Sequence, residues 1–186
     1  MRVCLFVFCL FQCLENLDMK LGTGFGLFNL GDPLGRISLG ICMDLNPFPP
    51  AVWSSREGPY ELANFAIDNN TRLLIILCAW LDSKAHPEEP WDKETVNYWL
   101  ARLLPLWKRI NEQQVEQDTV VVICNRAGAD GGLYYLRIRP SLPLTLLQDM
   151  LFAGTSSIFR LSQAKDVPEI LGLMRRDEEG IRVLAV

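Results

Sequence analysis

The sequence predicts a mixed α/β fold. Short runs of aliphatic and β-branched residues alternate along the chain with segments of helical periodicity, a pattern typical of strands joined by helices. The 186 residues are 49% hydrophobic and 22% charged, which is the composition of a globular domain with a sizeable core. Parallel strands joined in this way end at one edge of a sheet, so the residues after each predicted strand are the first candidates for a functional site.

The predicted strands are short and apolar. The first covers Arg36–Ile41, and the second is the apolar run at residues 72–78, which is expected to be buried on both faces. Further segments are expected in this order: a strand at residues 119–124, a strand at 156–161, a short helix or turn at 168–176 and a strand at 180–186.

Two helices are predicted between these strands. The first covers residues 57–68, and the second covers residues 93–113. In the second helix, apolar residues that include Trp99 and Trp107 recur at three- and four-residue spacing, so both tryptophans are assigned to the core. Pro105 is expected to kink this helix. Its polar residues are expected on the opposite, solvated side: Lys93, Glu94, Asn97, Arg102 and Lys108.

Cys42 is the candidate nucleophile of the chain. It directly follows the predicted strand Arg36–Ile41 and precedes the turn-forming residues 44–47. Ligands bind at this end of the strands in open α/β sheets, and a thiolate there becomes reactive when a nearby base or positive charge lowers its pKa. Asp44 is expected to fix the turn by accepting backbone hydrogen bonds. The alternative interpretation is that Cys42 is a buried structural thiol.

Residues after the next two predicted strands are expected near Cys42. Trp80 follows the second strand, and Asn125 and Arg126 follow the third. In the functional interpretation, Trp80 forms a pocket wall, Arg126 is an orienting or structural charge, Asn125 contributes to substrate binding, and the amide of Met43 stabilises an oxyanion. The alternative is that Trp80 and Arg126 are packing residues.

Several classes of function are disfavoured by composition. The formal net charge is −4 and no basic stripe is present, which argues against binding to nucleic acid or to an anionic membrane. The six cysteines show no C-x-x-C spacing, and His86, the only histidine, lies in a proline-bounded loop. The sequence therefore predicts no metal site, no histidine-dependent triad and, because it has no phosphate-binding loop, no cofactor. The glycines at residues 22–26 are interpreted as a loop.

The segment L-G-I-C-M-D-L-N-P at residues 39–47 resembles the nucleophile segment of the nitrilase (carbon-nitrogen hydrolase) superfamily, and more narrowly that of the fungal protein N-terminal amidases. The resemblance covers about residues 24 to 186. It continues through further blocks in the order of the family, at residues 61–66, 79–81, 124–130, 152–157 and 178–181.

The resemblance implies an α-β-β-α sandwich and a cysteine hydrolase that uses a glutamate, a lysine and a cysteine, with no cofactor. Cys42 takes the cysteine position and would form a thioester, releasing ammonia from a side-chain amide. The implied substrates are protein or peptide N-termini that bear Asn or Gln. Their conversion to Asp or Glu marks proteins for the N-degron degradation pathway, which implies a cytoplasmic enzyme.

Only Cys42 of the three catalytic positions matches, because too few residues precede it to contain the glutamate segment. Lys20 lies in the wrong local sequence for the lysine. The expectation is therefore a carbon-nitrogen hydrolase domain at residues 23–186 that is incomplete at its N-terminus, after an atypical apolar segment at residues 1–22. That segment is open to interpretation as a buried strand, a short core helix or foreign sequence, but it is too short to span a bilayer.

Three functions remain open at this point. The first is an N-terminal amidase, the second is a catalytically inactive nitrilase-fold protein without the glutamate and lysine, and the third is a plain α/β domain. Loss of the leading strands would expose a sheet edge, so oligomerisation is expected. The family pattern is also interrupted: Asp130 replaces the usual glutamate, and an insertion, expected to form a strand or loop, occupies residues 131–150.

Overall fold

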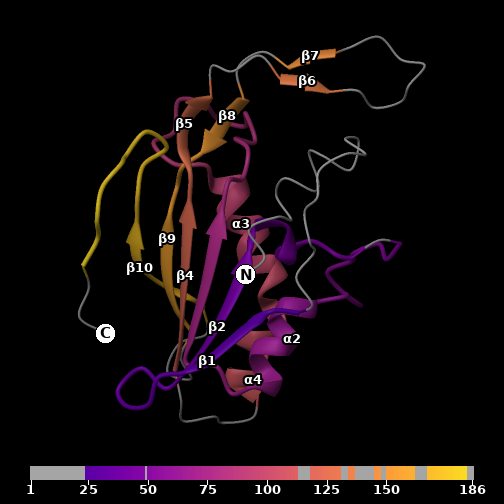
Figure 1. The fold of residues 1–186 in the computed structure, drawn as a ribbon, viewed down its shortest axis with the longest axis vertical. Helices are drawn as coiled ribbons and strands as arrows, with labels where there is room; N and C mark the ends of the chain where they lie inside the picture. Colours follow the sequence, from indigo (N-terminus) through magenta and orange to yellow (C-terminus); the bar gives the residue numbers. More distant parts are fainter. Residues whose placement is uncertain are drawn as a thin grey trace.

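The main body of the molecule is one six-stranded mixed sheet with strand order β1-β2-β3-β4-β9-β10 (Figure 1). The computed structural model describes residues 24–48, 50–112, 118–130, 134–136, 145–147, 150–161 and 167–183. The expectations for residues 1–22 and 184–186 lie outside this part of the chain. The strands of the main sheet are β1 (Gly26–Asn29), β2 (Arg36–Ile41), β3 (Leu73–Cys78), β4 (Thr119–Asn125), β9 (Ser157–Leu161) and β10 (Glu169–Leu173).

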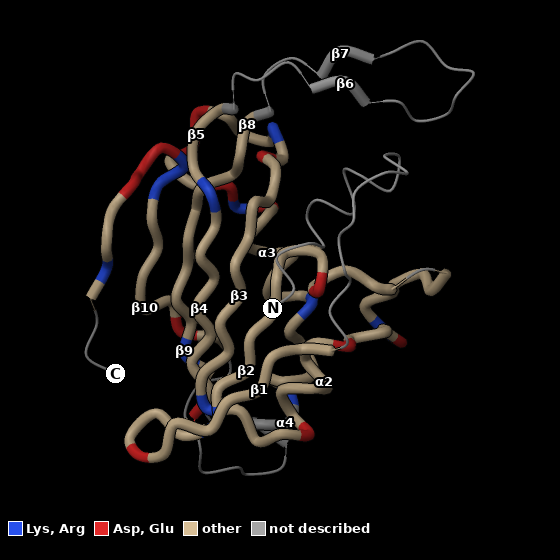
Figure 2. Tube along the Cα trace, in the orientation of Figure 1, with Lys and Arg blue, Asp and Glu red and all other residues tan. Residues whose placement is uncertain are grey.

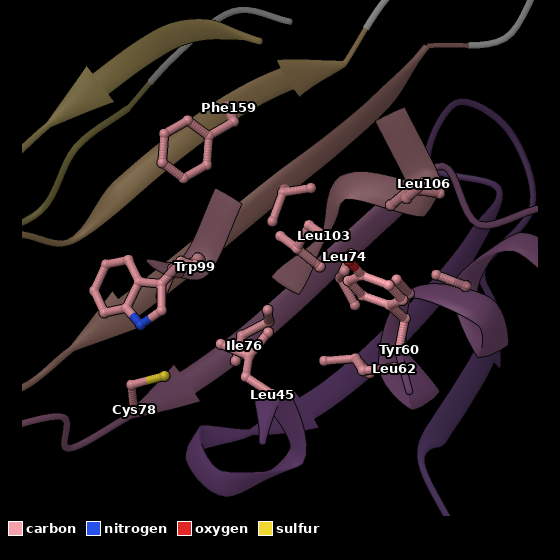
Figure 3. Close-up of a cluster of buried hydrophobic side chains, with 14 of the residues drawn as sticks. Leu45, Tyr60, Leu62, Leu74, Ile76, Cys78, Trp99, Leu103, Leu106 and Phe159 are labelled. Atoms are coloured by element: carbon pink, nitrogen blue, oxygen red, sulfur yellow. The ribbon is translucent and has the colours of Figure 1, made fainter. Parts of the chain in front are cut away.

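The helices cover one face of this sheet (Figure 1). They are the 3-10 helix η1 (Cys42–Leu45) and the α-helices α2 (Glu61–Asp68), α3 (Lys93–Arg102) and α4 (Leu104–Glu112). A hydrophobic core fills the space between the sheet and the helices, with Leu74 and Ile76 of the sheet and Trp99 of α3 fully buried in it (Figure 3). The predicted α/β class is confirmed, and the described residues form one sheet layer and one helix layer.

The three central strands run parallel and are paired in register. In β2 and β3, Ile41 lies opposite Leu77, and in β3 and β4, Cys78 lies opposite Asn125. The carboxyl ends of these strands therefore meet at one edge of the sheet, as predicted. The charged residues lie mainly toward the strand ends and in the connections, so the middle of the sheet is almost free of charge (Figure 2).

Two small antiparallel sheets extend from this edge (Figure 1). One pairs β5 (Ala127–Asp130) with β8 (Met150–Ala153), and the other pairs β6 (Tyr134–Leu136) with β7 (Thr145–Leu147). The second sheet lies within residues 131–150, the segment expected to be an insertion. Its described residues form strands, and its being an insertion relative to the family stays a prediction.

Several predicted boundaries were wrong. The helix predicted at residues 57–68 begins at Glu61, because Ser54 and Gly58 exchange two backbone hydrogen bonds of 2.9 Å and hold a tight turn there. The helix or turn predicted at residues 168–176 is strand β10, which pairs with β9. Residues 180–183 form no strand.

Strand β3 is not buried on both faces as predicted. Leu74 and Ile76 are fully buried against the helices, but Leu77 on the opposite face is 46% exposed. The physical reason is the layer order, since the described helices all cover the same face of the sheet. An apolar sequence alone does not reveal on how many faces a strand is covered.

The predicted long helix is divided near Pro105, as expected. Helix α3 ends at Arg102, and α4 begins two residues later at Leu104. Proline has no backbone N–H and cannot continue the hydrogen-bond ladder. Trp99 is fully buried, which confirms its place in the core, whereas Trp107 is only partly buried against the core cluster.

Arg102 was predicted on the solvated side of this helix, and that prediction was wrong. The residue is only 3% exposed. The guanidinium donates hydrogen bonds to the carbonyl oxygens of Leu45 and Pro59 and lies 5.1 Å from the ring centroid of Trp53. Arg102 lies three residues after Trp99 and seven after Thr95, so helical periodicity in fact places it on the buried face of α3, where its guanidinium serves as the donor to these carbonyl groups.

Asp92 at the start of α3 joins two distant parts of the chain. Its fully buried carboxylate accepts hydrogen bonds from the backbone and side chain of Ser83, both at 2.7 Å, and from the backbone and side chain of Thr95. Arg176, after β10, lies 3.6 Å from the same carboxylate and also pairs with Asp82. Burial on its own raises the pKa of Asp92, but the hydrogen bonds from Ser83 and Thr95 outweigh it, so the pKa is lowered overall.

We expect Asp92→Ala to lower the free energy of unfolding by about 3 kcal/mol or more, because it leaves several buried donors and Arg176 without their acceptor. The pKa of Asp92 is lower in the folded state than in the unfolded chain. The ionised carboxylate therefore stabilises the folded state in full above the ordinary Asp pKa of about 3.9, and this stabilisation is lost as the pH falls through the folded-state pKa. Urea unfolding between neutral and acidic pH measures both effects.

The matched control is Asp177→Ala, which removes an exposed carboxylate 3.6 Å from Arg175. A surface pair of this kind contributes only about 0–1 kcal/mol. Equal losses in the two variants, or an Asp92→Ala protein that keeps the acid sensitivity of the wild type in full, would contradict the role given to Asp92.

Candidate active site

Cys42 lies in a sharp turn at the carboxyl end of β2. Its φ of +30° departs from the region that residues other than glycine favour, and η1 begins at this residue. The backbone N–H of Ile41 donates a 2.9 Å hydrogen bond to Oδ2 of Asp44, so Asp44 fixes the turn as predicted. Strained backbone of this kind often marks a functional residue.

The thiol of Cys78 lies next to Cys42. Cys42 and Cys78 occupy the positions directly after the register partners Ile41 and Leu77, and both are buried in the same core cluster, at 2% and 9% exposure. A hydrogen bond from the Cys78 thiol lowers the pKa of Cys42, as does one from the backbone N–H of Ala79. Burial and the charge of Asp44 oppose this shift but do not cancel it.

Asn125, at the end of β4, lies opposite Cys78 and connects several strand ends. Its Oδ1 accepts a 2.7 Å hydrogen bond from the backbone N–H of Trp80, and its Nδ2 donates to the carbonyl oxygens of Gly154, at 2.9 Å, and Trp80. Its backbone N–H donates to Oγ of Ser156. Asn125 therefore holds the end of β3 against the segment between β8 and β9, and its predicted contact with a substrate stays a prediction.

Aromatic side chains surround the end of β3. The Trp80 ring lies 5.4 Å from the Tyr98 ring and 6.5 Å from the Trp99 ring, measured between centroids. The Tyr98 hydroxyl donates a hydrogen bond to Oδ1 of Asn46, the residue that follows η1. Trp80 is half-buried, so it has both the packing contacts of a core residue and the partial exposure that a pocket wall needs.

Met43 lies beside Cys42, whereas the Arg126 side chain lies away from it, against β8. Met43 is partly buried beside Cys42, and its sulfur accepts a 3.2 Å hydrogen bond from Nδ2 of Asn46. Arg126 is exposed, and its guanidinium lies 4.4 Å from the centroid of the Phe152 ring on β8. The structure thus brings Cys42, Met43, Trp80 and Asn125 to the ends of β2, β3 and β4, whereas the Arg126 side chain contacts the small sheet beyond them.

Three further residues of this region were missed by sequence reasoning: Cys78, Tyr98 and Arg102. Cys78 ends the apolar run of β3, just as Cys42 directly follows β2. This shared position of two cysteines was the available signal for Cys78. Tyr98 and Arg102 lie in the helical pattern beside core positions, and no local signal points to their partners. Among the described residues, no group of three or more His, Cys, Asp or Glu side chains lies close enough together to hold a metal ion.

Comparisons with known proteins identify two curated relatives. The protein N-terminal amidase of Schizosaccharomyces pombe is 31% identical over 175 residues, which are 87% of this chain and 51% of that protein. The protein N-terminal amidase of Saccharomyces cerevisiae is 34% identical over 62 residues, or 33% of this chain and 12% of that protein. The chain therefore spans about half the length of the first relative. No protein-family profile matches the chain.

Solved structures of N-terminal amidases also resemble this chain in fold. The crystal structure of an N-terminal amidase with an Asn-Glu-Ala peptide matches with a TM-score of 0.51 and 16% identity, covering 87% of this chain and 66% of that one. The structure with an Asn-Glu peptide matches with a TM-score of 0.54 and 16% identity, covering 86% and 65%. These matches confirm the type of fold that the resemblance implied. No helix in the described part of the chain is long and apolar enough to cross a membrane.

Proposed function

Because this chain belongs to the nitrilase (carbon-nitrogen hydrolase) superfamily, we propose that it is an amidohydrolase of the protein N-terminal amidase type. In this proposal, residues 23–186 form the hydrolase unit, and the reaction releases ammonia from the side-chain amide of an N-terminal Asn or Gln. The products carry Asp or Glu and enter the N-degron pathway in the cytoplasm.

The observation that carries the proposal is the setting of Cys42. Its thiol lies at the carboxyl end of β2, in a turn fixed by Asp44, and hydrogen bonds from the Cys78 thiol and the Ala79 N–H lower its pKa. A thiol with these properties is suited to nucleophilic attack on an amide carbon. A structural thiol in an apolar core has its pKa raised instead.

The proposed reaction has two stages. The Cys42 thiolate attacks the carbonyl carbon of the side-chain amide to give a tetrahedral intermediate. The proton that the thiol released passes to the amide nitrogen, the carbon–nitrogen bond breaks, ammonia leaves, and the thioester remains. Water then attacks the thioester, which gives the carboxylic acid and restores the thiol. The backbone N–H of Met43 is the proposed donor to the oxyanion of each intermediate.

The proposed substrate class is supported by two structurally similar N-terminal amidases, whose crystal structures hold Asn-Glu and Asn-Glu-Ala peptides. We extend this binding to the present chain, with Trp80 as a wall of the pocket and Asn125 and Arg126 as the residues that orient the peptide. Gln is longer than Asn by one methylene, a difference for which a pocket discriminates by only about 10- to 200-fold.

The test is ammonia release by the purified chain from short peptides that begin with Asn or Gln. We expect turnover of these peptides and none of the same peptides with an acetylated N-terminus or with the amide residue moved to an internal position. Turnover of the blocked peptides would contradict the N-terminal specificity. No turnover of any peptide would favour the competing interpretation, a nitrilase-fold protein that lacks the glutamate and lysine of the family.

A further inference from the structure

Two side chains of α3 bind the end of η1 through hydrogen bonds. The Nε atom of Arg102 donates to the carbonyl oxygen of Leu45. The hydroxyl of Tyr98, one turn earlier on the helix, donates to Oδ1 of Asn46, the next residue along the chain. Residues one turn apart lie on the same side of a helix, so α3 holds the end of η1 at two consecutive residues.

Asn46 connects Tyr98 with Met43. The Nδ2 atom of Asn46 donates a 3.2 Å hydrogen bond to the Met43 sulfur, and its backbone N–H donates a 2.9 Å hydrogen bond to the Met43 carbonyl oxygen. Met43 directly follows Cys42, and its backbone N–H is the proposed donor to the oxyanion. The position of that donor therefore depends on the position of Asn46.

The ring of Tyr98 has a separate contact with the proposed pocket wall. Its centroid lies 5.4 Å from that of Trp80 and 5.9 Å from that of Trp53. All three aromatic side chains are partly buried and pack against the core cluster. The hydroxyl and the ring of Tyr98 thus contact different parts of the candidate site, and replacement by phenylalanine removes only the contact of the hydroxyl.

We propose that Tyr98 is a positioning residue for the amidase reaction: its hydroxyl holds Asn46 in place and thereby fixes the Met43 N–H where the oxyanion forms. The inference rests on the function proposed for Cys42 and Met43. An oxyanion exists only in the tetrahedral intermediates and the transition states around them, so a displaced donor slows the reaction without weakening the binding of the peptide.

The test compares wild type with Tyr98→Phe in the release of ammonia from a short peptide that begins with Asn. We expect kcat to fall about tenfold, because small displacements of catalytic groups are costly, while KM changes by less than about twofold. Asn46→Ala is expected to lower kcat by at least as much. The double variant should have the same kcat as Asn46→Ala, since the hydroxyl then has no partner left to lose.

Tyr60→Phe is the matched control. The Tyr60 hydroxyl donates a 2.8 Å hydrogen bond to the carbonyl oxygen of Ser55, and its ring lies 6.2 Å from that of Trp53, so this variant also removes the hydrogen bond of one tyrosine hydroxyl. It should keep kcat within about twofold of wild type. Urea unfolding of both variants shows whether their losses of stability are comparable.

An unchanged kcat in Tyr98→Phe would overturn the inference, and so would equal losses of kcat in Tyr98→Phe and Tyr60→Phe. A rise in KM at constant kcat would assign Tyr98 to the pocket wall alone and would contradict the proposal as well. The same holds if the loss of kcat in the double variant equals the product of the two single losses.

Hydrogen exchange of the Asn46 backbone N–H, followed by NMR, tests the turn without any amide substrate. This group donates to Met43, so its exchange should be about tenfold faster in Tyr98→Phe than in wild type and unchanged in Tyr60→Phe. Faster exchange in a chain that turns over no peptide would remove the amidase reaction, and with it the catalytic effect of Tyr98, but would keep the hydrogen bond as the anchor of the turn. Normal turnover with an unchanged kcat in Tyr98→Phe would remove only the role of Tyr98.

Discussion

Replacement of Cys42 by alanine is expected to reduce ammonia release from N-terminal Asn peptides by about 1,000-fold or more, because no thioester can form without the sulfur. The folded state should survive, since alanine is smaller than cysteine and removes one buried sulfur from the edge of the core. Steady-state ammonia production and urea unfolding, measured on the same preparation, separate the loss of chemistry from a loss of structure.

Cys124→Ala is the matched control for this variant. Cys124 also lies near the end of a central strand, but partial burial of its thiol raises its pKa, so it is not activated. Its removal should leave turnover within about twofold of wild type. Full activity of Cys42→Ala, or equal losses in the two variants, would show that the thiol of Cys42 is not the nucleophile.

Gly154→Ala is expected to cause the largest loss of stability from a single added methyl group. A Cβ atom at Gly154 would lie 2.2 Å from the carbonyl oxygen of Arg176, and the φ of +55° is itself unfavourable for alanine. Strain and overpacking each contribute about 1–3 kcal/mol, so the free energy of unfolding should fall by about 2–6 kcal/mol. Equilibrium unfolding in urea measures this loss.

Gly31→Ala isolates the backbone part of this effect. Gly31 has a φ of +68°, similar to that of Gly154, but a Cβ atom there would have no neighbour within 4 Å among the described residues beyond those adjacent in the chain. It should lose only about 1–2 kcal/mol. Because the carbonyl of Gly154 accepts from Asn125, the Gly154 variant should also lose amidase activity, whereas the Gly31 variant should not. Similar losses in both variants would rule out the contact with Arg176 as the cause.

The central strands and their ends could be predicted because the signals are local. An apolar run followed by turn residues marks β2, β3 and β4, and the positions of Cys42, Trp80 and Asn125 at the strand ends follow from it. The polar turn after β2 was equally visible, and the bond from Ile41 to Asp44 confirms the reason given for it.

The remaining features depend on contacts between distant segments. The spacing of Arg102 from Thr95 and Trp99 matches the buried face of α3, but the carbonyl groups of Leu45 and Pro59 that accept from its guanidinium are distant in sequence and no local pattern reveals them. Strand β10 forms because it pairs with the free edge of β9. It is only five residues long and contains a glycine, so its own sequence is a weak strand signal. The burial of Cys42 and Cys78 in the same core cluster depends on the pairing of β2 with β3, which the sequence does not reveal by itself.

The pairing of β5 with β8 brings together the two ends of the segment that connects these strands. Asp130 and Met150 are register partners, so the chain leaves and returns at adjacent positions on the same small sheet. Because the entropy of closing a loop grows slowly with its length, evolution can lengthen or shorten the intervening segment at little cost to the strand ends around Cys42. The same position is suited to the insertion of an affinity tag or a fluorescent label.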